Sequence, residues 1–592
     1  MAAKHFINDP TLLVNSALES LTLTNPSVAL DSKNKIIYRR PSPSAKHQVS
    51  IISGGGSGHE PSFGAFVGNG LLSAAVAGSI FASPSAEQVR AAITSRVDTE
   101  RGVLVTVMNY TGDILNFGMA VEKAKAAGVA AEMVVVGDDV GVGRAKGGKV
   151  GRRGIAGTVL VHKIAGALAA QGASLEQVQK VAKLTAENLV SVGASLDHVH
   201  VPGRQVSSKQ HLDDGEVEIG MGIHNEAGSE QAKLDLPQLV KKMLAQLLDQ
   251  NDKDRAFVNV NSNEVVLLVN NLGGVSVLEL GGITTEVVKQ LGSGWGISPV
   301  RILSGTYMTS LNGLGFSISL LNVVNTDIGG PSMIQLLDYP CEATGWAAPI
   351  VKETWETHNT ATRDDAPQDE STEMKKSDLT TDAESFAASL TSGLKAVIAA
   401  EPEVTRYDTV VGDGDCGIGL KRGADAVLRH IQKNTPTSDV VAEVEKIVTV
   451  VEDSMDGTSG ALFAILLNAL VHSLRSANPG EATAQTWATA LKHSCEALSK
   501  YTPARPGDRT LVDSLYPFVE SLEKTGDLVN AADAAKQGAL KTKGMHAVLG
   551  RAVYVGESRY DEVPDPGAWG LAAFFLGLAG LQLNEDDGWE AI

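Results

Sequence analysis

Cysteine is scarce in this sequence. The three cysteines among 592 residues, Cys341, Cys416 and Cys495, are far apart and odd in number. They match neither a disulfide framework nor a zinc-ligand spacing, which favours a reducing compartment. The N-terminus lacks the apolar core of a signal peptide, and the longest apolar stretches, 461–470 and 571–583, are too short or too broken by glycine to span a bilayer. We expect a cytoplasmic protein without a membrane partner.

Basic residues are also in deficit. Asp and Glu number 69 against 50 for Lys and Arg, which gives a formal net charge of −19. Nucleic-acid binding depends largely on neutralising phosphates with basic side chains, so we expect no nucleic-acid partner. The chain is too long for one hydrophobic core, and about two to four domains are expected.

One stretch has almost no aliphatic residues. Residues 352–384 are polar and cannot bury enough apolar surface to order themselves. We interpret 351–384 as an interdomain linker between a first domain, 1–350, and a second domain, 385–592.

Before the linker, short β-branched runs alternate with helical patterns. The runs are 48–52, 103–108, 133–136 and 265–269, and the helical patterns include 115–127 and 234–248. This alternation predicts an α/β region with a mostly parallel sheet. Roughly 350 residues is long for one such unit, so we predict two α/β subdomains that join near 194–215.

After the linker, strand patterns nearly vanish. Helical periodicity runs through 385–400, 424–432, 440–452, 461–474, 482–500 and 511–524. The pattern predicts an all-α C-terminal domain.

Three carboxylates lie close together in this domain. Asp408, Asp413 and Asp415 fall within eight residues, among several glycines that allow the backbone to fold tightly. Hard oxygen ligands suit Mg²⁺ or Ca²⁺, and Mg²⁺ usually combines a few carboxylates with substrate phosphates. An acidic surface turn is the alternative. The spacing is not that of an EF-hand.

A second motif, DGTSGAL at 456–462, precedes a strongly apolar helical pattern. Thr458 or Ser459 can cap that helix, and the free N–H groups of a helix N-terminus bind phosphate. Capping alone explains these residues equally well. A phosphate cradle in the same domain as a metal-type loop nevertheless indicates a nucleotide site. The turns at 504–510 and 565–568 are only turns by themselves.

Two strand ends in the α/β region carry polar side chains. His59 lies in the SGGGSGHE loop, and Asp113 lies in the NYTGD segment. Ligands bind at the carboxyl ends of strands in α/β sheets, so the two side chains are candidates for one crevice, as a general base and its partner. A structural histidine is the alternative. Neither nucleotide fingerprint is present, because the nearest Walker-like segment has Val150 where Ser or Thr is required.

His224 lies between glycines in the segment EIGMGIHNEAG at 218–228. From its neighbours alone, it is a turn histidine that bonds to a backbone carbonyl.

Taken together and in this order, the segments resemble the single-chain, ATP-dependent dihydroxyacetone kinases. The shared strings span nearly the whole chain: SGGGSGHEP, NYTGD, GMGIH, GDGDCG, GTSGAL, GDRT, RAVYVGE and DPGA. The resemblance implies an N-terminal unit that binds the triose and a C-terminal helical barrel that binds Mg²⁺–ATP. It also implies a homodimer with exchanged domains, and D-glyceraldehyde as a second substrate.

The resemblance assigns the triose site. A ring nitrogen of His224 would add to the carbonyl of dihydroxyacetone, which excludes glycerol and orients the reacting hydroxyl. His59 and Asp113 would bind the substrate hydroxyls, and one of them would help to remove the proton. Further implied substrate contacts are Gly56, Ser57, Gly58 and Met108, the last of which stands where many relatives have lysine.

The resemblance also assigns the nucleotide site. Asp408, Asp413 and Asp415 would hold Mg²⁺ against the phosphates. The implied nucleotide contacts are Asp413, Gly414, Asp415, Cys416, Thr458, Ser459, Gly460, Arg505, Asp565, Pro566 and Gly567. Two alternatives remain: an FAD-AMP lyase that forms cyclic FMN in the same domain, and a non-catalytic regulatory paralogue.

Overall fold

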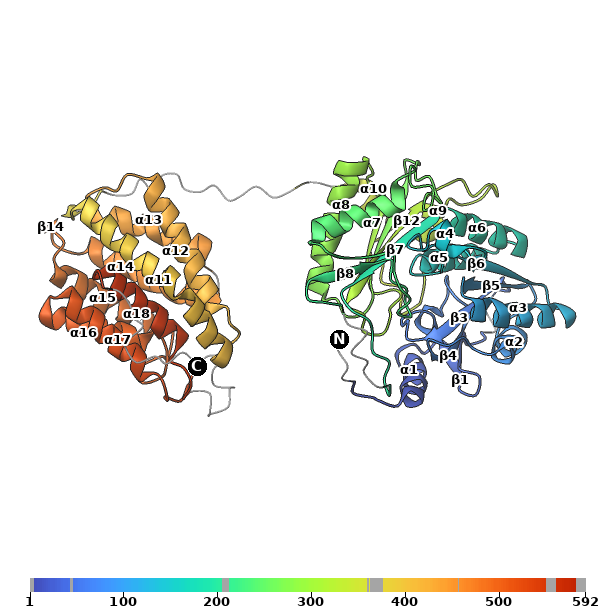
Figure 1. The fold of residues 1–592 in the computed structure, drawn as a ribbon, viewed down its shortest axis with the longest axis horizontal. Helices are drawn as coiled ribbons and strands as arrows, with labels where there is room; N and C mark the ends of the chain where they lie inside the picture. The colour runs from blue at the N-terminus through green and yellow to red at the C-terminus, as the bar shows by residue number, and fades with distance from the viewer. Residues whose placement is uncertain are drawn as a thin grey trace. The chain divides into compact units, whose positions relative to one another are not determined.

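The computed structural model describes residues 5–42, 46–204, 212–358, 361, 376–455, 457–549 and 561–581. The chain divides into two compact units, Met1–Thr362 and Arg363–Ile592 (Figure 1). The first unit is α/β and the second is mostly helical, which confirms the predicted order of fold types. The predicted domain boundaries at 350 and 384 stay predictions.

The first sheet of the α/β unit has the strand order β1-β2-β4-β3-β5-β6. Its central strands β4, β3, β5 and β6 are parallel, whereas β1 and β2 pair antiparallel at one edge. The strands are β1 (Val28–Asp31), β2 (Ile36–Arg39), β3 (Ser50–Ser57), β4 (Ala74–Ile80), β5 (Val103–Met108) and β6 (Ala131–Val136).

Alternate residues of this sheet enter two different cores, as strand geometry requires. Ile52 and Val105 pack with α2 and α3, whereas Ile51 and Leu104 face the core that contains α5. The helices, with one 3-10 turn, are α1 (Pro10–Thr24), η1 (Gly64–Phe66), α2 (Ala86–Ser95), α3 (Thr111–Ala126), α4 (Arg144–Gly147), α5 (Thr158–Ala170) and α6 (Leu175–Glu187).

The second sheet has the order β11-β10-β12-β7-β8-β9. Only the β10–β11 pair is parallel, so the predicted mostly parallel arrangement is wrong for this sheet. A β-branched run marks a strand but does not specify its partner, and β12 returns antiparallel between β10 and β7. The elements are β7 (Leu189–Ser195), β8 (Glu216–Ile219), β9 (Glu230–Lys233), α7 (Leu236–Leu248), β10 (Val265–Asn271), α8 (Val277–Trp295), β11 (Arg301–Gly305), β12 (Gly315–Asn322), α9 (Met333–Leu337) and α10 (Lys352–Thr357).

Helix α5 contributes to a core that both sheets share. Its residues 158–169 are all buried, and Ile51 of the first sheet and Leu268 of the second belong to the same core. The change of sheet occurs between β6 and β7, so the predicted join near 194–215 is wrong, because β7 already belongs to the second sheet. The division into two subdomains stays a prediction.

The second unit contains long helices with one short strand pair. The predicted helices are present, and α11 extends far enough to include Asp408. A parallel pair of two-residue strands is a small departure from the predicted all-α domain. The elements are β13 (Leu379–Thr380), α11 (Ala383–Val411), α12 (Cys416–Lys433), α13 (Val440–Ser454), α14 (Gly457–Arg475), β14 (Gly480–Glu481), α15 (Ala484–Leu498), α16 (Val512–Thr525), α17 (Leu528–Lys541) and α18 (Pro566–Leu578).

The range interpreted as a linker is partly structured. Helix α10 and strand β13 both fall inside 351–384. Residues 359–360 and 362–375 lie outside the described residues.

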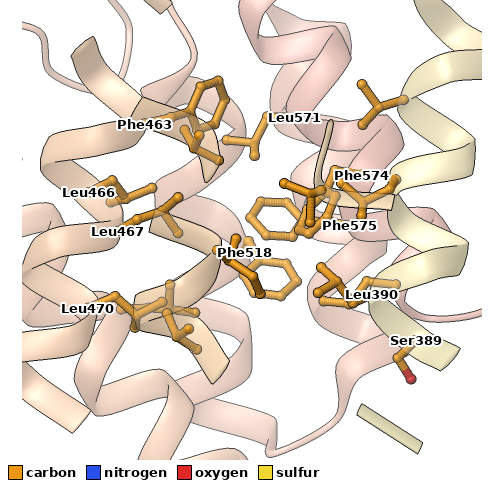
Figure 2. A pocket seen from close by; sticks show the side chains of 18 of the residues that line it. Ser389, Leu390, Phe463, Leu466, Leu467, Leu470, Phe518, Leu571, Phe574 and Phe575 are labelled. Carbon is orange, nitrogen blue, oxygen red and sulfur yellow. The ribbon is translucent and has the colours of Figure 1, made fainter. Parts of the chain in front are cut away.

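The helices of the second unit surround an apolar cavity of about 440 Å³. Figure 2 shows Phe463, Leu466 and Leu467 of α14 facing Phe518 and Phe575 across it. Within the described part of the chain, α14 is the one helix that is long and apolar enough to cross a membrane by length and composition. The cavity lining gives a different reason for its apolar character.

Candidate functional site

The glycine run before His59 is needed for close backbone packing. A Cβ on Gly56 would lie 2.7 Å from the backbone nitrogen of Ala82. Gly58 has φ +105°, where a side chain is strained. The run therefore carries β3 tightly past the segment that follows β4 and delivers a fully buried His59 at the strand end. Contact of Gly56, Ser57 and Gly58 with substrate stays a prediction.

His59 and His224 meet directly, although they are far apart in the sequence. Their Nε2 atoms are 3.0 Å apart, and the two rings lie at 78° to each other. The Nδ1 atom of His59 lies 2.8 Å from the carbonyl oxygen of Thr309. Burial, followed by the charge of His224, lowers the pKa of His59 to about 3. His59 is therefore a neutral ring beside His224.

His224 has a carboxylate partner that the sequence motifs did not single out. Its Nδ1 atom lies 2.8 Å from Oε1 of Glu226, and its backbone N–H donates to Oε2 of the same carboxylate at 2.9 Å. The i, i+2 spacing in a glycine-rich turn was the available signal. The interpretation of His224 as a turn histidine bonded to a backbone carbonyl is wrong, since the partner is a side chain.

Two aromatic rings complete the surroundings of His224. Phe81 stacks on His59 with centroids 5.3 Å apart, and it meets His224 edge-on at 5.1 Å. Tyr110 meets His224 edge-on at 4.7 Å. Sequence reasoning missed Phe81, Tyr110 and Thr309 because each depends on which loops come together.

Asp113 lies in the first turn of α3 and is 4% exposed. Burial raises its pKa, against a hydrogen bond from Ser83 and the charge of His224. Its Oδ1 atom is buried without a hydrogen-bond partner among the described residues. Such an oxygen is a natural acceptor for a ligand hydroxyl.

Met108 is the last residue of β5 and is 1% exposed. It belongs to the core that both sheets share, and a Cβ on Gly154 would lie 2.7 Å from its own Cβ. Its proposed effect on substrate binding stays a prediction.

A cavity of about 420 Å³ lies between α1 and the β3–β4 strand pair. Its lining includes Gly56 and Ser57 but does not include His59, His224 or Asp113. We therefore locate the chemical centre by the convergence of the polar side chains and not by this cavity.

The three carboxylates of the second unit converge as expected. One oxygen from each of Asp408, Asp413 and Asp415 lies within 4.8 Å of the others. Asp408 comes from the last turn of α11 and accepts a hydrogen bond from the backbone N–H of Cys416 at 3.0 Å. Three carboxylates fit the hard-oxygen preference of Mg²⁺.

Several helix N-termini lie near this cluster. The Sγ atom of Cys416, in the first turn of α12, lies 3.9 Å from Oγ of Ser459, in the first turn of α14. Since α14 begins at Gly457, Thr458 and Ser459 are first-turn residues, and the suggestion that either of them is the N-cap is wrong. Free N–H groups at these ends suit phosphate oxygens.

Asp565 caps α18 by accepting a hydrogen bond from the backbone N–H of Ala568 at 2.8 Å. Burial raises the pKa of Asp565 to about 6, and the charges of Asp513 and Asp408 add to this against that of Arg509. The influence of Asp408 places the DPGA turn near the metal-type cluster.

Arg505 is already used within its own loop. Its guanidinium donates to the carbonyl oxygens of Ser499, Thr502 and Ala504 at the end of α15. A nucleotide contact for Arg505 stays a prediction. Arg509 of the same GDRT turn is 2% exposed and donates to the carbonyl of Val563 at 2.8 Å; the sequence motifs did not assign it. Residues 551–557, RAVYVGE, lie outside the described residues.

Comparison with known proteins gives a consistent result. The Dak1 domain model matches residues 19–345, and the DAK2 domain model matches residues 410–580. The chain is 43% identical to dihydroxyacetone kinase 2 of Saccharomyces cerevisiae, over 98% of this chain and 99% of that protein. It is 36% identical to triokinase/FMN cyclase of Bos taurus, over 98% of each chain.

Solved structures extend the likeness to the fold. The dihydroxyacetone kinase of C. freundii in its native form is 31% identical with a TM-score of 0.60, over 98% of this chain and 99% of that chain. Its complex with AMP-PNP and Mg²⁺ has 32% identity and the same TM-score of 0.60, over 98% and 100%. With both domains matched and relatives aligned from end to end, this chain belongs to the dihydroxyacetone kinase family.

Proposed function

We propose that the chain is an ATP-dependent kinase that converts dihydroxyacetone to dihydroxyacetone phosphate. The observation that carries the proposal is the presence of two different sites in one chain. The α/β unit has the His59–His224 contact at 3.0 Å, and the helical unit has three carboxylates within 4.8 Å. Relatives named dihydroxyacetone kinases align with both units, which supports the assignment.

The triose is held through its carbonyl. The Nε2 atom of His224 bonds to the carbonyl carbon, and the carbonyl oxygen takes up a proton, which forms a hemiaminal. Glycerol has no carbonyl and is excluded. The unpartnered Oδ1 of Asp113 accepts a substrate hydroxyl, and Asp113 or His59 helps to remove the proton of the attacking oxygen. D-Glyceraldehyde has the same reactive group and is a second substrate.

The nucleotide is held in the helical unit, in the helical barrel of the family. Asp408, Asp413 and Asp415 are the ligands of Mg²⁺. When bound, Mg²⁺ neutralises phosphate charge during phosphoryl transfer. The first turns of α12, α14 and α18 offer backbone N–H groups to the phosphates. The contacting residues are Asp413, Gly414, Asp415, Cys416, Thr458, Ser459, Gly460, Arg505, Asp565, Pro566 and Gly567.

A coupled assay with ATP, Mg²⁺ and dihydroxyacetone tests the proposal, with His224→Ala in parallel. We expect turnover that requires Mg²⁺ in the wild type and a large loss of apparent affinity for dihydroxyacetone in the variant. A wild type without turnover overturns the kinase assignment. Equal activity of the variant at low substrate concentration overturns the covalent role of His224.

A second activity has a specific observation in its favour. Triokinase/FMN cyclases of Bos taurus and Homo sapiens are 36% and 34% identical to this chain over 98% of its length. Release of AMP from FAD in the presence of Mn²⁺ would support an FAD-AMP lyase activity in the helical unit, and no release would dismiss it. Retention of His224 and the three aspartates argues against a non-catalytic regulatory paralogue.

We further propose a cytoplasmic homodimer with exchanged domains. Mixing His224→Ala with Asp413→Ala subunits tests the exchange. Recovered turnover supports it, and no recovery in mixed dimers overturns it.

A further inference from the structure

The hydrogen bonds around His59 and His224 determine where the ring protons lie. The oxygen of Thr309 is a carbonyl and only accepts, so the Nδ1 atom of His59, 2.8 Å away, carries a proton. Burial opposes ionisation of Glu226, but its two hydrogen bonds from His224 and the charge of that ring lower its pKa to about 2. Glu226 is therefore an ionised acceptor, and the Nδ1 atom of His224, 2.8 Å from it, also carries a proton.

This assignment leaves the contact between the two Nε2 atoms to be explained. If both rings were neutral, each Nε2 would present a lone pair, and two lone pairs would face each other at 3.0 Å. One further proton between them turns the contact into an ordinary N–H···N hydrogen bond. Because burial keeps His59 neutral, this proton belongs to His224.

We propose that Glu226 is a positioning residue for the triose site. It holds the Nδ1–H side of His224, directs Nε2 toward the reacting position, and balances the charge of one proton stored between His224 and His59. The inference rests on the proposed function, because the same histidine is the one that bonds to dihydroxyacetone.

The stored proton is the one that adduct formation requires. The Nε2–H bond of His224 breaks, and the freed electron pair bonds to the carbonyl carbon. The π pair of the carbonyl takes the same proton, relayed through the Nε2 atom of His59, and becomes a hydroxyl. The His224 ring remains positively charged with its Nδ1–H on Glu226, so the net charge does not change and the solvent supplies no proton.

The surroundings of Glu226 fit a fixed carboxylate. A Cβ on Gly222 would lie 2.1 Å from Oε2 of Glu226 and 2.5 Å from Nη1 of Arg153, so glycine leaves the space that the two groups occupy. Arg153 is itself held, since its Nε donates to Asp139 at 2.8 Å and its Nη2 donates to the carbonyl of Gly220 at 2.7 Å. The carboxylate and the guanidinium therefore lie side by side in space that a larger residue at position 222 would remove.

The first test needs no variant of Glu226. Nitrogen-15 NMR of the full-length, ligand-free protein with labelled histidine reports which ring nitrogens carry protons, and His59→Gln and His224→Gln variants assign the signals. We expect His224 to be protonated at both ring nitrogens and His59 at Nδ1 alone. A neutral His224 overturns the stored proton, and a His224 without a proton at Nδ1 overturns the role of Glu226.

The second test uses Glu226→Gln. Glutamine offers one acceptor oxygen to the two donors of His224 and has no charge to balance the proton. We expect His224 to become neutral, kcat/KM for dihydroxyacetone to fall by about 100-fold, and KM for ATP to stay unchanged. With dihydroxyacetone labelled with carbon-13 at the carbonyl, the signal of the tetrahedral carbon weakens. Unchanged histidine signals and unchanged kinetics overturn the inference.

Asp98→Asn is the matched control, because it removes a carboxylate 2.7 Å from the Nδ1 atom of exposed His47 in the same unit. We expect wild-type kinetics from it, and a comparable loss of activity would show that the effect of Glu226→Gln is not specific. Failure of the proposed function is distinguishable, since a wild type without turnover of dihydroxyacetone would still show or lack the predicted ring protons.

Discussion

At the scale of single residues, the triose site depends on which partner each polar atom has. His59 and His224 both have their Nδ1 atoms engaged, whereas Oδ1 of Asp113 is buried and has no hydrogen-bond partner among the described residues. An engaged atom orients a side chain, and an unengaged buried oxygen is available to a ligand. Asp113 is therefore the residue whose loss is expected to affect the reaction more than the architecture.

Asp113→Asn is expected to lower kcat by roughly 10²–10⁴-fold, the usual contribution of an acid–base group, with a smaller change in KM for dihydroxyacetone. Asparagine keeps the shape of the side chain and cannot accept the proton. Steady-state kinetics with ATP in excess measures both constants. Glu122→Gln, on the exposed side of the same helix, is the control and is expected to retain wild-type values. A near-wild-type kcat for Asp113→Asn would refute the assignment.

His162 predicts acid sensitivity at a second buried position. Both of its ring nitrogens lack hydrogen-bond partners among the described residues, and burial lowers its pKa to about 3. The unfolded ring titrates near 6.5, so the folded state loses relative stability as the pH falls from about 6.5 toward 3. Between pH 7 and 5 this loss amounts to about 2 kcal/mol.

His162→Phe is expected to remove that component. Urea unfolding of the α/β unit at pH 7 and pH 5 measures it, and the difference between the two pH values is expected to be smaller in the variant than in the wild type. An equal pH dependence in both proteins would show that His162 does not contribute.

At the scale of elements, the end of β3 is shaped by glycines that allow neighbouring backbones to touch. A Cβ on Gly56 meets the backbone of Phe81 at 2.9 Å as well as that of Ala82 at 2.7 Å. Backbone atoms cannot move aside as a flexible side chain can. Phe81 contacts both site histidines, so a shift of this segment reaches the site.

Gly56→Ala is therefore expected to lower stability by about 1–3 kcal/mol and to reduce kcat/KM for dihydroxyacetone. Gly281→Ala is a matched control in α8, where an added Cβ meets nothing within 4 Å. Helix propensity predicts that this control is neutral or stabilising by up to about 1 kcal/mol. Thermal unfolding and the coupled assay measure both variants, and a harmless Gly56→Ala would contradict the close-packing argument.

At the scale of the whole molecule, each of the two units has its own site. A ligand that binds only the folded form stabilises the unit that holds it, by about 2.7 kcal/mol at a concentration of 100 times Kd. Calorimetry is expected to show dihydroxyacetone raising the transition of the α/β unit and ATP with Mg²⁺ raising that of the helical unit.

Removal of Mg²⁺ with EDTA, or the Asp413→Ala variant, is expected to abolish the nucleotide effect and leave that of dihydroxyacetone. Asp98→Asn again serves as the control, and it should keep both effects. A nucleotide effect that survives without Mg²⁺ and without Asp413 would contradict the assignment of the metal site.

The sequence by itself determined the features that depend on local pattern. Strand and helix periodicity predicted the α/β-then-helical order, and three aspartates in eight residues predicted a metal-type cluster because neighbours in sequence cannot be far apart in space. Family strings added the identity of the substrate, which no local chemistry indicated for His224.

Only the tertiary structure decided which distant segments meet. The antiparallel order of the second sheet, the Thr309–His59–His224–Glu226 chain of contacts and the occupied guanidinium of Arg505 all depend on partners that packing brings together. A side chain's chemistry is set by its partners, and those are chosen by packing of the whole chain. The same residue types therefore give an ordinary turn histidine in the sequence and a charged, oriented ring in the folded protein.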